Sequence, residues 1–314
     1  DYASTHFAKD ANGWTALPLV KVLETASRTG DPDLRQRGLA LLERLDRRFR
    51  HTVPRGAQTW EIPLHTPDIL ASAHLVKAFV LGYALSGERR WLEAAKRWAW
   101  TGVAFTYLTD PARGEVGVYA TTPVLGATQW IAPNWIGLPV QWCGLVYADA
   151  LLDLHSLDAN PVWRQLAEGI VASAWIQTHP AAGTGSPSSA IRRQGLLPDS
   201  WNLLAEVRND AAINPATTLV PWSRLIGDPV AHWRVLSPGG WNVQAPGRID
   251  ALGVREFRVK GWPNQPYEIL VAKAGAGKIS GECDGASAGL PFRTGPGWAV
   301  FEAVGTVRVK ITEN

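Results

Sequence analysis

Apolar residues recur at helical spacing over the first two thirds of the chain. Three stretches share one plan, in which an apolar helix, a short turn and a second helix follow one another: residues 14–49, 67–105 and 137–174. In the first stretch the turn falls at residues 29–32, where a glycine can end one helix and a proline can begin the next. We therefore expect consecutive antiparallel helical hairpins.

The period of the pattern changes toward the C-terminal end. A fourth, less regular helical section is expected from Asp199 to about Ile226. Beyond it, apolar and polar residues alternate, as in residues 267–271 and 307–311, and Gly, Pro and Asn separate these runs. The pattern predicts a mostly α protein, with a helical domain over residues 1–228 and a small antiparallel β-sandwich over residues 229–314.

Composition and charge exclude several classes of partner. Hydrophobic residues make up 46% of the chain and the formal net charge is only +3, with basic residues scattered among acidic ones. Because there is no basic stripe, nucleic acid is not expected as a partner. No apolar run approaches the roughly 20 residues of a spanning helix, so no membrane partner is expected either. Cys143 lies in an apolar helical stretch and is expected to be a buried thiol.

The beginning of the chain suggests processing. The sequence starts at Asp1 and contains no Met, so we expect it to derive from a longer precursor whose N-terminal portion is absent, and to be secreted. It also contains 16 Trp, well above ordinary usage, and the flat indole suits sugar rings as well as protein cores.

The hairpin rhythm, with turns such as residues 87–95, resembles the six-hairpin glycosidase superfamily, whose members form (α/α) toroids. Residues 60–68 and 133–142 are similar to the polar, aromatic hairpin starts that line the mouth of such toroids. The resemblance covers residues 10–228. It implies carbohydrate chemistry and an (α/α) toroid that is incomplete, since about four helix pairs are visible in the sequence where a closed toroid has six.

The first candidate site segment is residues 60–68. Glycosidic cleavage needs a carboxylic acid to protonate the leaving oxygen and a second carboxylate as base or nucleophile. Glu61 and Asp68 supply these groups, with His65 between them and Trp60 for sugar stacking. The alternative is that Asp68 caps its helix and His65 bonds to the backbone.

The second candidate segment, residues 126–142, mixes indoles with amide groups. Such side chains stack on sugars and bond their hydroxyl groups; they are Trp130, Asn134, Trp135, Gln141 and Trp142. Trp135 and Trp142 are seven residues apart, so both could instead lie on one core-facing side of a helix.

The third candidate segment begins near residue 195. It holds Asp199, as a possible partner carboxylate or alternatively an N-cap, with Trp201 for stacking. Arg208 could bind a uronate carboxylate through two bonds. A fainter signal is Tyr119 with Glu115, because Tyr serves as acid or base in polysaccharide lyases.

These residues predict a carbohydrate-active enzyme that cleaves glycosidic bonds, as a glycoside hydrolase or a polysaccharide lyase, without cofactor or catalytic metal. The alternative is a noncatalytic sugar-binding or surface-layer protein on the same scaffold. Asp68 is expected to lie within about 5 to 10 Å of Glu61 or Asp199. We further expect four indoles to converge on one concave surface: Trp60, Trp130, Trp135 and Trp201.

Overall fold

The computed structural model describes residues 10–57, 66–126, 137–179, 196–204, 206–208, 212–213, 220–222, 224–225, 232–237, 239–284, 291 and 293–313. At residues 207–208, 212–213 and 232–234 only the main chain is described.

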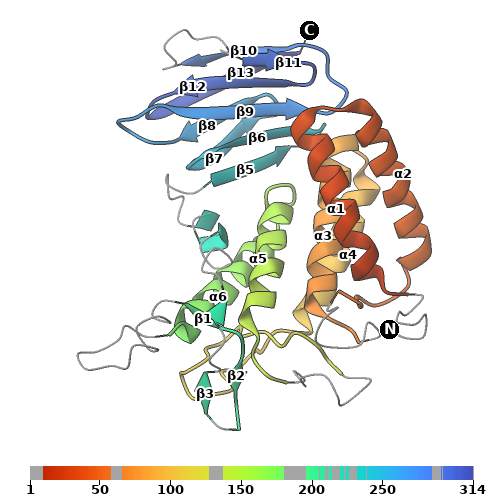
Figure 1. Cartoon of the computed structure of the whole chain (residues 1–314), viewed down its shortest axis with the longest axis vertical. Coiled ribbons are helices and arrows are strands. Elements are labelled where there is room, and N and C mark those ends of the chain that lie inside the picture. Colours follow the sequence, from red (N-terminus) through yellow and green to blue (C-terminus); the bar gives the residue numbers. More distant parts are fainter. Residues whose placement is uncertain are drawn as a thin grey trace.

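Three antiparallel helical hairpins form the first part of the fold, as the hydrophobic spacing predicts (Figure 1). They pair α1 (Asn12–Thr29) with α2 (Pro32–Phe49), α3 (Ile69–Ser86) with α4 (Arg89–Val103), and α5 (Gln141–His155) with α6 (Pro161–Gln177).

The turn between α1 and α2 shows how local sequence sets these hairpins. Gly30 ends α1 in the left-handed conformation, with φ of 71°. The next residue, Asp31, caps α2 by accepting hydrogen bonds from the main-chain N–H groups of Asp33 and Leu34. Pro32 then occupies the first turn, where a missing N–H costs nothing. Stop and start signals therefore follow one another without a loop.

The helices form two rows. In the inner row α1 packs on α3 and α3 on α5, while α2, α4 and α6 form an outer row against their own partners. Helix α3 is the one helix, among the described residues, that is long and apolar enough to cross a membrane. Because 78% of that stretch is buried inside the protein, against α1, α4 and α5, packing accounts for its apolarity.

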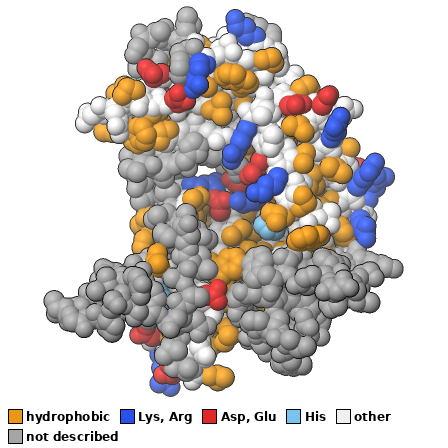
Figure 2. Space-filling model, in the orientation of Figure 1, with side chains coloured by type: hydrophobic (Ala, Val, Ile, Leu, Met, Phe, Trp, Pro, Cys, Tyr) orange, Lys and Arg blue, Asp and Glu red, His pale blue; other side chains and the backbone are white. Residues whose placement is uncertain are grey.

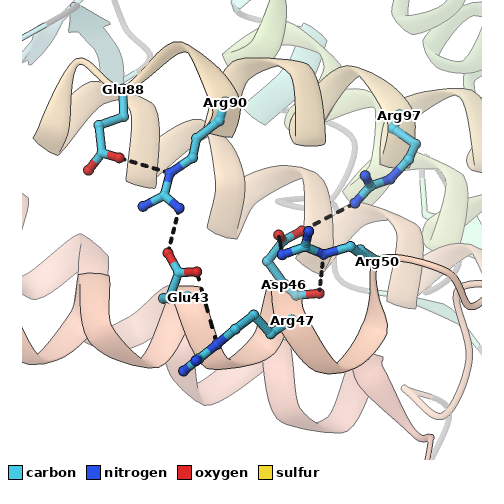
Figure 3. Close-up of polar contacts among 7 residues, drawn as sticks. All are labelled: Glu43, Asp46, Arg47, Arg50, Glu88, Arg90 and Arg97. Carbon is cyan, nitrogen blue, oxygen red and sulfur yellow. Dashed lines mark hydrogen bonds and ion pairs between the residues drawn. The ribbon is translucent and has the colours of Figure 1, made fainter.

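Ion pairs join the outer helices α2 and α4 at the surface (Figure 3). Arg90 binds Glu43 at 2.7 Å and Glu88 at 2.8 Å, while Asp46 binds Arg50 at 2.8 Å and Arg97 at 3.4 Å. Most of these side chains are exposed, so each pair contributes at most about 1 kcal/mol.

The expected fourth helical section is wrong over its first part. The described residues there form short strands: β1 (Leu197–Pro198), β2 (Trp201–Asn202), β3 (Val207–Arg208) and β4 (Ala212–Ile213). The Asn202 side chain accepts a hydrogen bond from the N–H of Leu204 at 3.0 Å, and Glu206 has φ of 52°. This local turn bends the chain into a β2–β3 hairpin and replaces the helix. Residues 220–222 and 224–225 are helical.

Every described element from His232 onward is a strand, which confirms the change of period. The strands are β5 (His232–Ser237), β6 (Trp241–Pro246), β7 (Arg248–Gly253), β8 (Glu256–Lys260), β9 (Tyr267–Lys273), β10 (Ile279–Asp284), β11 (Arg293–Gly295), β12 (Trp298–Ala303) and β13 (Thr306–Glu313).

These strands form two antiparallel sheets, with orders β10-β13-β8-β7 and β11-β12-β9-β6-β5. Inward residues of both sheets share one hydrophobic core, with Phe257 and Val309 from the first and Ile269 and Phe301 from the second. The module is therefore a β-sandwich.

The sandwich and the short strands lie at opposite ends of the helical rows (Figure 1). At the sandwich end, the N–H of Gly275 donates to the carbonyl of Gly30 at 3.0 Å. Leu236 and Ala274 of the C-terminal part join the hydrophobic core of the helices. The boundary between the two domains stays a prediction.

Candidate active site

Main-chain hydrogen bonds tie several loops together at the amino ends of the inner helices. They run from the N–H of Asp68 to Pro54 O (3.1 Å), Ile69 to Pro123 O (3.1 Å), Val140 to Thr121 O (2.9 Å) and Trp201 to Pro139 O (2.8 Å). We call this end the mouth; it comprises residues 54–57, 66–69, 119–125, 137–142 and 197–202. The three segments singled out in the sequence all reach it or flank it.

Asp68 is fully buried in the mouth and caps α3. Its Oδ1 accepts from the N–H of Ala71 at 2.7 Å and its Oδ2 accepts from the N–H of Ala57 at 2.9 Å. The capping role that the sequence allowed is thus confirmed, and the second oxygen adds a link to the preceding loop. Both of its oxygens already accept main-chain hydrogen bonds. Its proposed role as acid or base stays a prediction.

Asp199 lies in the turn between β1 and β2, so the alternative expectation that it caps a helix is wrong. Its carboxyl is half-buried, and this burial raises the pKa of Asp199. A hydrogen-bonding interaction with the side chain of Trp142 opposes the shift but is the smaller effect. Trp142 itself lies half-buried in the first turn of α5. A raised pKa is a feature that general-acid carboxyls share, and the role of Asp199 in catalysis stays a prediction.

Trp201 is only 2% exposed. Its indole packs with Val116 and Ala120 in a small hydrophobic cluster at the mouth. In this packing its faces are covered by protein, so its expected stacking on sugar stays a prediction that this structure does not support.

Several predicted site residues lie outside the described part of the chain, and their roles stay predictions: Trp60, Glu61, His65, Trp130, Asn134 and Trp135. The expected convergence of Trp60, Trp130, Trp135 and Trp201 on one surface therefore stays a prediction, because only Trp201 is among the described residues. Arg208 is described only by its main chain, which pairs with Trp201 in the β2–β3 hairpin.

The side chain of Gln141, which was expected to bond sugar hydroxyls, is buried and bonds the protein instead. It is 1% exposed, and its Oε1 accepts from the N–H of Thr121 at 2.9 Å. Its Nε2 donates to Ile170 O at 2.8 Å. The buried amide thus has both of its polar atoms bonded, and it links a mouth loop to α6. The ring of Tyr119 likewise lies against Gly169 of α6.

A charged cluster on the inner helices is absent from the sequence predictions. Asp149 of α5 pairs with Lys77 of α3, and Arg224 pairs with Asp149 and, at 2.9 Å, with Asp153. Side-chain exposure is only 9% for Arg224 and 2% for Asp153. The sequence signal for this cluster is the presence of charged residues within apolar helical stretches, Lys77 in residues 69–85 and Asp149 and Asp153 in residues 143–154. The sequence does not show which of these residues pair, because the pairs form between segments that are distant in the chain.

The cluster forms one wall of a pocket of about 230 Å³. The pocket is lined by Glu24, Arg28, Lys77, Asp149, Val220, Arg224 and Gln244, so α1, α3, α5 and the sandwich strand β6 all contribute. Acidic and basic side chains also gather around the hollow in the middle of the face shown in Figure 2.

His74 lies one turn before Lys77 on α3. Burial, together with the charges of Lys77 and Lys21, lowers the pKa of His74 to about 4. The imidazole is therefore neutral near pH 7 and adds no charge to the inner face.

No group of three His, Cys, Asp or Glu side chains within the described ranges is placed to hold a metal ion. Cys143 and Cys283 are both buried and form no disulfide with each other, as expected for the Cys143 thiol.

No protein-family model matches the chain, and no curated protein sequence matches it. Among solved structures it is similar to an unsaturated glucuronyl hydrolase from Bacillus sp. GL1, responsible for the degradation of glycosaminoglycan. That match has a TM-score of 0.44 and 16% identity, and covers 67% of this chain and 57% of that one.

Two further solved structures are similar. One is UGL with the saccharide dGlcA-Glc-Rha-Glc, at a TM-score of 0.41 and 19% identity, covering 67% of this chain and 57% of that one. The other is a GH127 beta-L-arabinofuranosidase from Geobacillus stearothermophilus T6, at 0.32 and 12%, covering 95% of this chain and 53% of that one. The chain thus spans a little over half of each protein. At TM-scores this low the likeness transfers no activity and no residue role.

Proposed function

We propose that the chain is a carbohydrate-active enzyme that cleaves glycosidic bonds, with Asp199 as the proton donor at the mouth. The observation that carries the proposal is the half-buried Asp199 carboxyl, whose pKa is raised by burial beside Trp142. A general acid must hold its proton near the working pH, and burial is the means by which proteins achieve this for a carboxyl.

In this mechanism the Asp199 carboxylic acid delivers its proton to the oxygen of the departing sugar. A second carboxylate acts on the anomeric carbon, either directly or through a water molecule. Asp68 is less suited to that second role than Glu61, since both Asp68 oxygens accept main-chain hydrogen bonds. The Trp142 indole supplies a flat, amphipathic face beside the acid. We propose that the protein is secreted and that its substrate is an extracellular polymer that contains uronate residues. Arg208 is the residue that we propose binds the uronate carboxylate.

The test is a panel of oligosaccharides and polysaccharides assayed for new reducing ends and for the ultraviolet absorbance of unsaturated uronates. Asp199→Asn should lower turnover by about 10²- to 10⁴-fold, because Asn cannot donate a carboxylic proton. Reducing ends without new absorbance indicate hydrolysis, and both together indicate a lyase.

Asp158→Asn is a matched control. Asp158 likewise lies beside an indole, since Trp163 Nε1 donates to its Oδ2 at 2.7 Å, but it lies in the turn before α6. Its replacement should leave turnover unchanged. Equal turnover in the Asp199→Asn protein and the parent would remove Asp199 from the mechanism.

One observation favours a noncatalytic sugar-binding protein as the second candidate. Two inner-face carboxylates of the described chain are engaged structurally, Asp68 by main-chain amides and Asp149 by Lys77 and Arg224. Saturable binding of a saccharide from the same panel, without any new reducing ends, would support this candidate.

A further inference from the structure

The helical rows follow a packing rule that is incomplete at α1. Each outer helix packs against its own inner partner, and α2 and α4 also contact the inner helix of the following pair, α3 and α5. Helix α1 is the first inner helix of the row. Among the residues that the structure describes, no helix occupies the equivalent place against α1.

An apolar groove of about 340 Å³ runs between α1 and α2. Its apolar lining comes from both helices and includes Pro18, Leu19, Val22, Leu41, Leu45 and Phe49. Leu41 of this lining is 44% exposed. Large apolar side chains gathered on one surface in this way indicate a site of interaction.

The lining of the groove is basic as well as apolar. Arg44 and Arg48 both line it, and they lie four residues apart on α2, so they stand one helical turn from each other. The lining residues include no carboxylate. A ligand for this groove therefore needs an apolar stripe and acidic groups beside it.

We propose that the α1–α2 groove binds an amphipathic helix of a partner polypeptide, with Asp or Glu residues flanking its apolar stripe. We infer a helical ligand from the packing rule, because a helix covers α3 and α5 in the same relative place. We infer acidic flanks on this ligand because Arg44 and Arg48 line the groove. A second copy of this chain docked groove to groove would bring both pairs of arginines together, and this repulsion disfavours a symmetric dimer.

The test uses a fluorescently labelled helical peptide with Leu at helical spacing and Glu on both flanks, and a twin peptide with Lys in place of Glu. Fluorescence anisotropy should show saturable binding of the Glu peptide and at least about tenfold weaker binding of the Lys peptide. Leu41→Asp should weaken binding of the Glu peptide about tenfold or more. Arg44→Glu should abolish the preference for the Glu peptide, because the introduced carboxylate cancels the charge of Arg48.

Leu108→Asp is the control, because Leu108 is also exposed, at 72%, but lies after α4, away from the groove. It should bind the Glu peptide like the parent, and thermal melting checks that each variant is folded. Three results would overturn the proposal. They are the absence of saturable binding, equal effects of Leu41→Asp and Leu108→Asp, and a dimer in analytical ultracentrifugation that Leu41→Asp dissociates, which would make the occupant a second copy.

Discussion

At the scale of single residues, two carboxylates of the mouth have opposite environments. Asp68 is fully buried, and each of its oxygens accepts a main-chain hydrogen bond. Asp199 is half-buried beside an indole, and burial raises its pKa. Hydrogen-bond donors stabilise a charged carboxylate, whereas desolvation favours the neutral acid. Asp68 is therefore engaged in holding the main chain, and proton transfer by Asp199 stays our proposal.

Asp68→Asn should destabilise the fold by about 1–3 kcal/mol, because the Asn amide group would face either the Ala57 or the Ala71 N–H, donor against donor. Urea denaturation gives the change. The matched control is Asp31→Asn, since Asp31 caps α2 through Oδ1 alone and Asn keeps that atom. It should change stability by no more than about 0.5 kcal/mol. Equal effects of both substitutions would contradict the role assigned to the second oxygen of Asp68.

Asp199→Asn should change stability in a pH-dependent way. The folded-state pKa of Asp199 is raised, so its favourable contribution is present at low pH and is lost as pH rises through that pKa. Asn stays neutral throughout. The melting temperature of the variant minus that of the parent should therefore increase as the pH is raised from below about 4 to 7. A pH-independent difference between the two proteins would show that Asp199 titrates normally.

At the scale of elements, ion pairs fix the segment that precedes the sandwich against the inner helix α5. Arg224 comes from the segment before the sandwich and binds Asp149 and Asp153 of α5. Trp222 of the same segment meets Trp175 of α6 at 5.5 Å between ring centroids. Trp222 and Leu225 also pack against the hydrophobic core of the helices, so these apolar contacts and the buried guanidinium together hold the short helical segment.

Arg224→Met should destabilise the fold by about 3–5 kcal/mol, since it leaves the buried Asp153 without its guanidinium. Arg97→Met is the control at the surface pair with Asp46, where Arg97 is 44% exposed, and it should cost less than about 1 kcal/mol. Chemical denaturation of both variants compares them directly. A cost for Arg224→Met as small as that for Arg97→Met would show that the pairing contributes little.

At the scale of the whole molecule, the helices and the sandwich meet backbone to backbone. Gly30 at the end of α1 lies against Gly297 in the β11–β12 turn, and both have positive φ. A Cβ on Gly297 would lie 2.7 Å from the Cα of Gly30. The seam between the two parts therefore tolerates no side chain at this point.

Gly297→Ala should destabilise the protein by about 1–3 kcal/mol more than Gly87→Ala. The two glycines have nearly the same φ, 74° and 73°, but a Cβ on Gly87 meets nothing within 4 Å. Both variants carry the cost of positive φ, and only Gly297→Ala forces the seam apart. Thermal unfolding measures the difference. Equal melting temperatures would mean that the sandwich can shift away from α1 without loss.

The sequence by itself determined the features that depend on neighbours in the chain. Asp31, Pro32 and Gly30 fixed the first hairpin turn, and Asp68 marked the start of α3, because caps act within one helical turn. The strand alternation beyond residue 232 was equally readable, since the period of two reflects local geometry.

Tertiary structure alone decided which polar and aromatic residues face solvent. Trp201 and Gln141 looked suited to a sugar site, yet both are buried, because residues about 20 to 80 positions away cover or bond them. The pairing of Asp149 with Lys77 and with Arg224 joins residues more than 70 positions apart. Burial and charge pairing depend on which distant segments meet, and the hydrophobic pattern of a single helix does not carry that information.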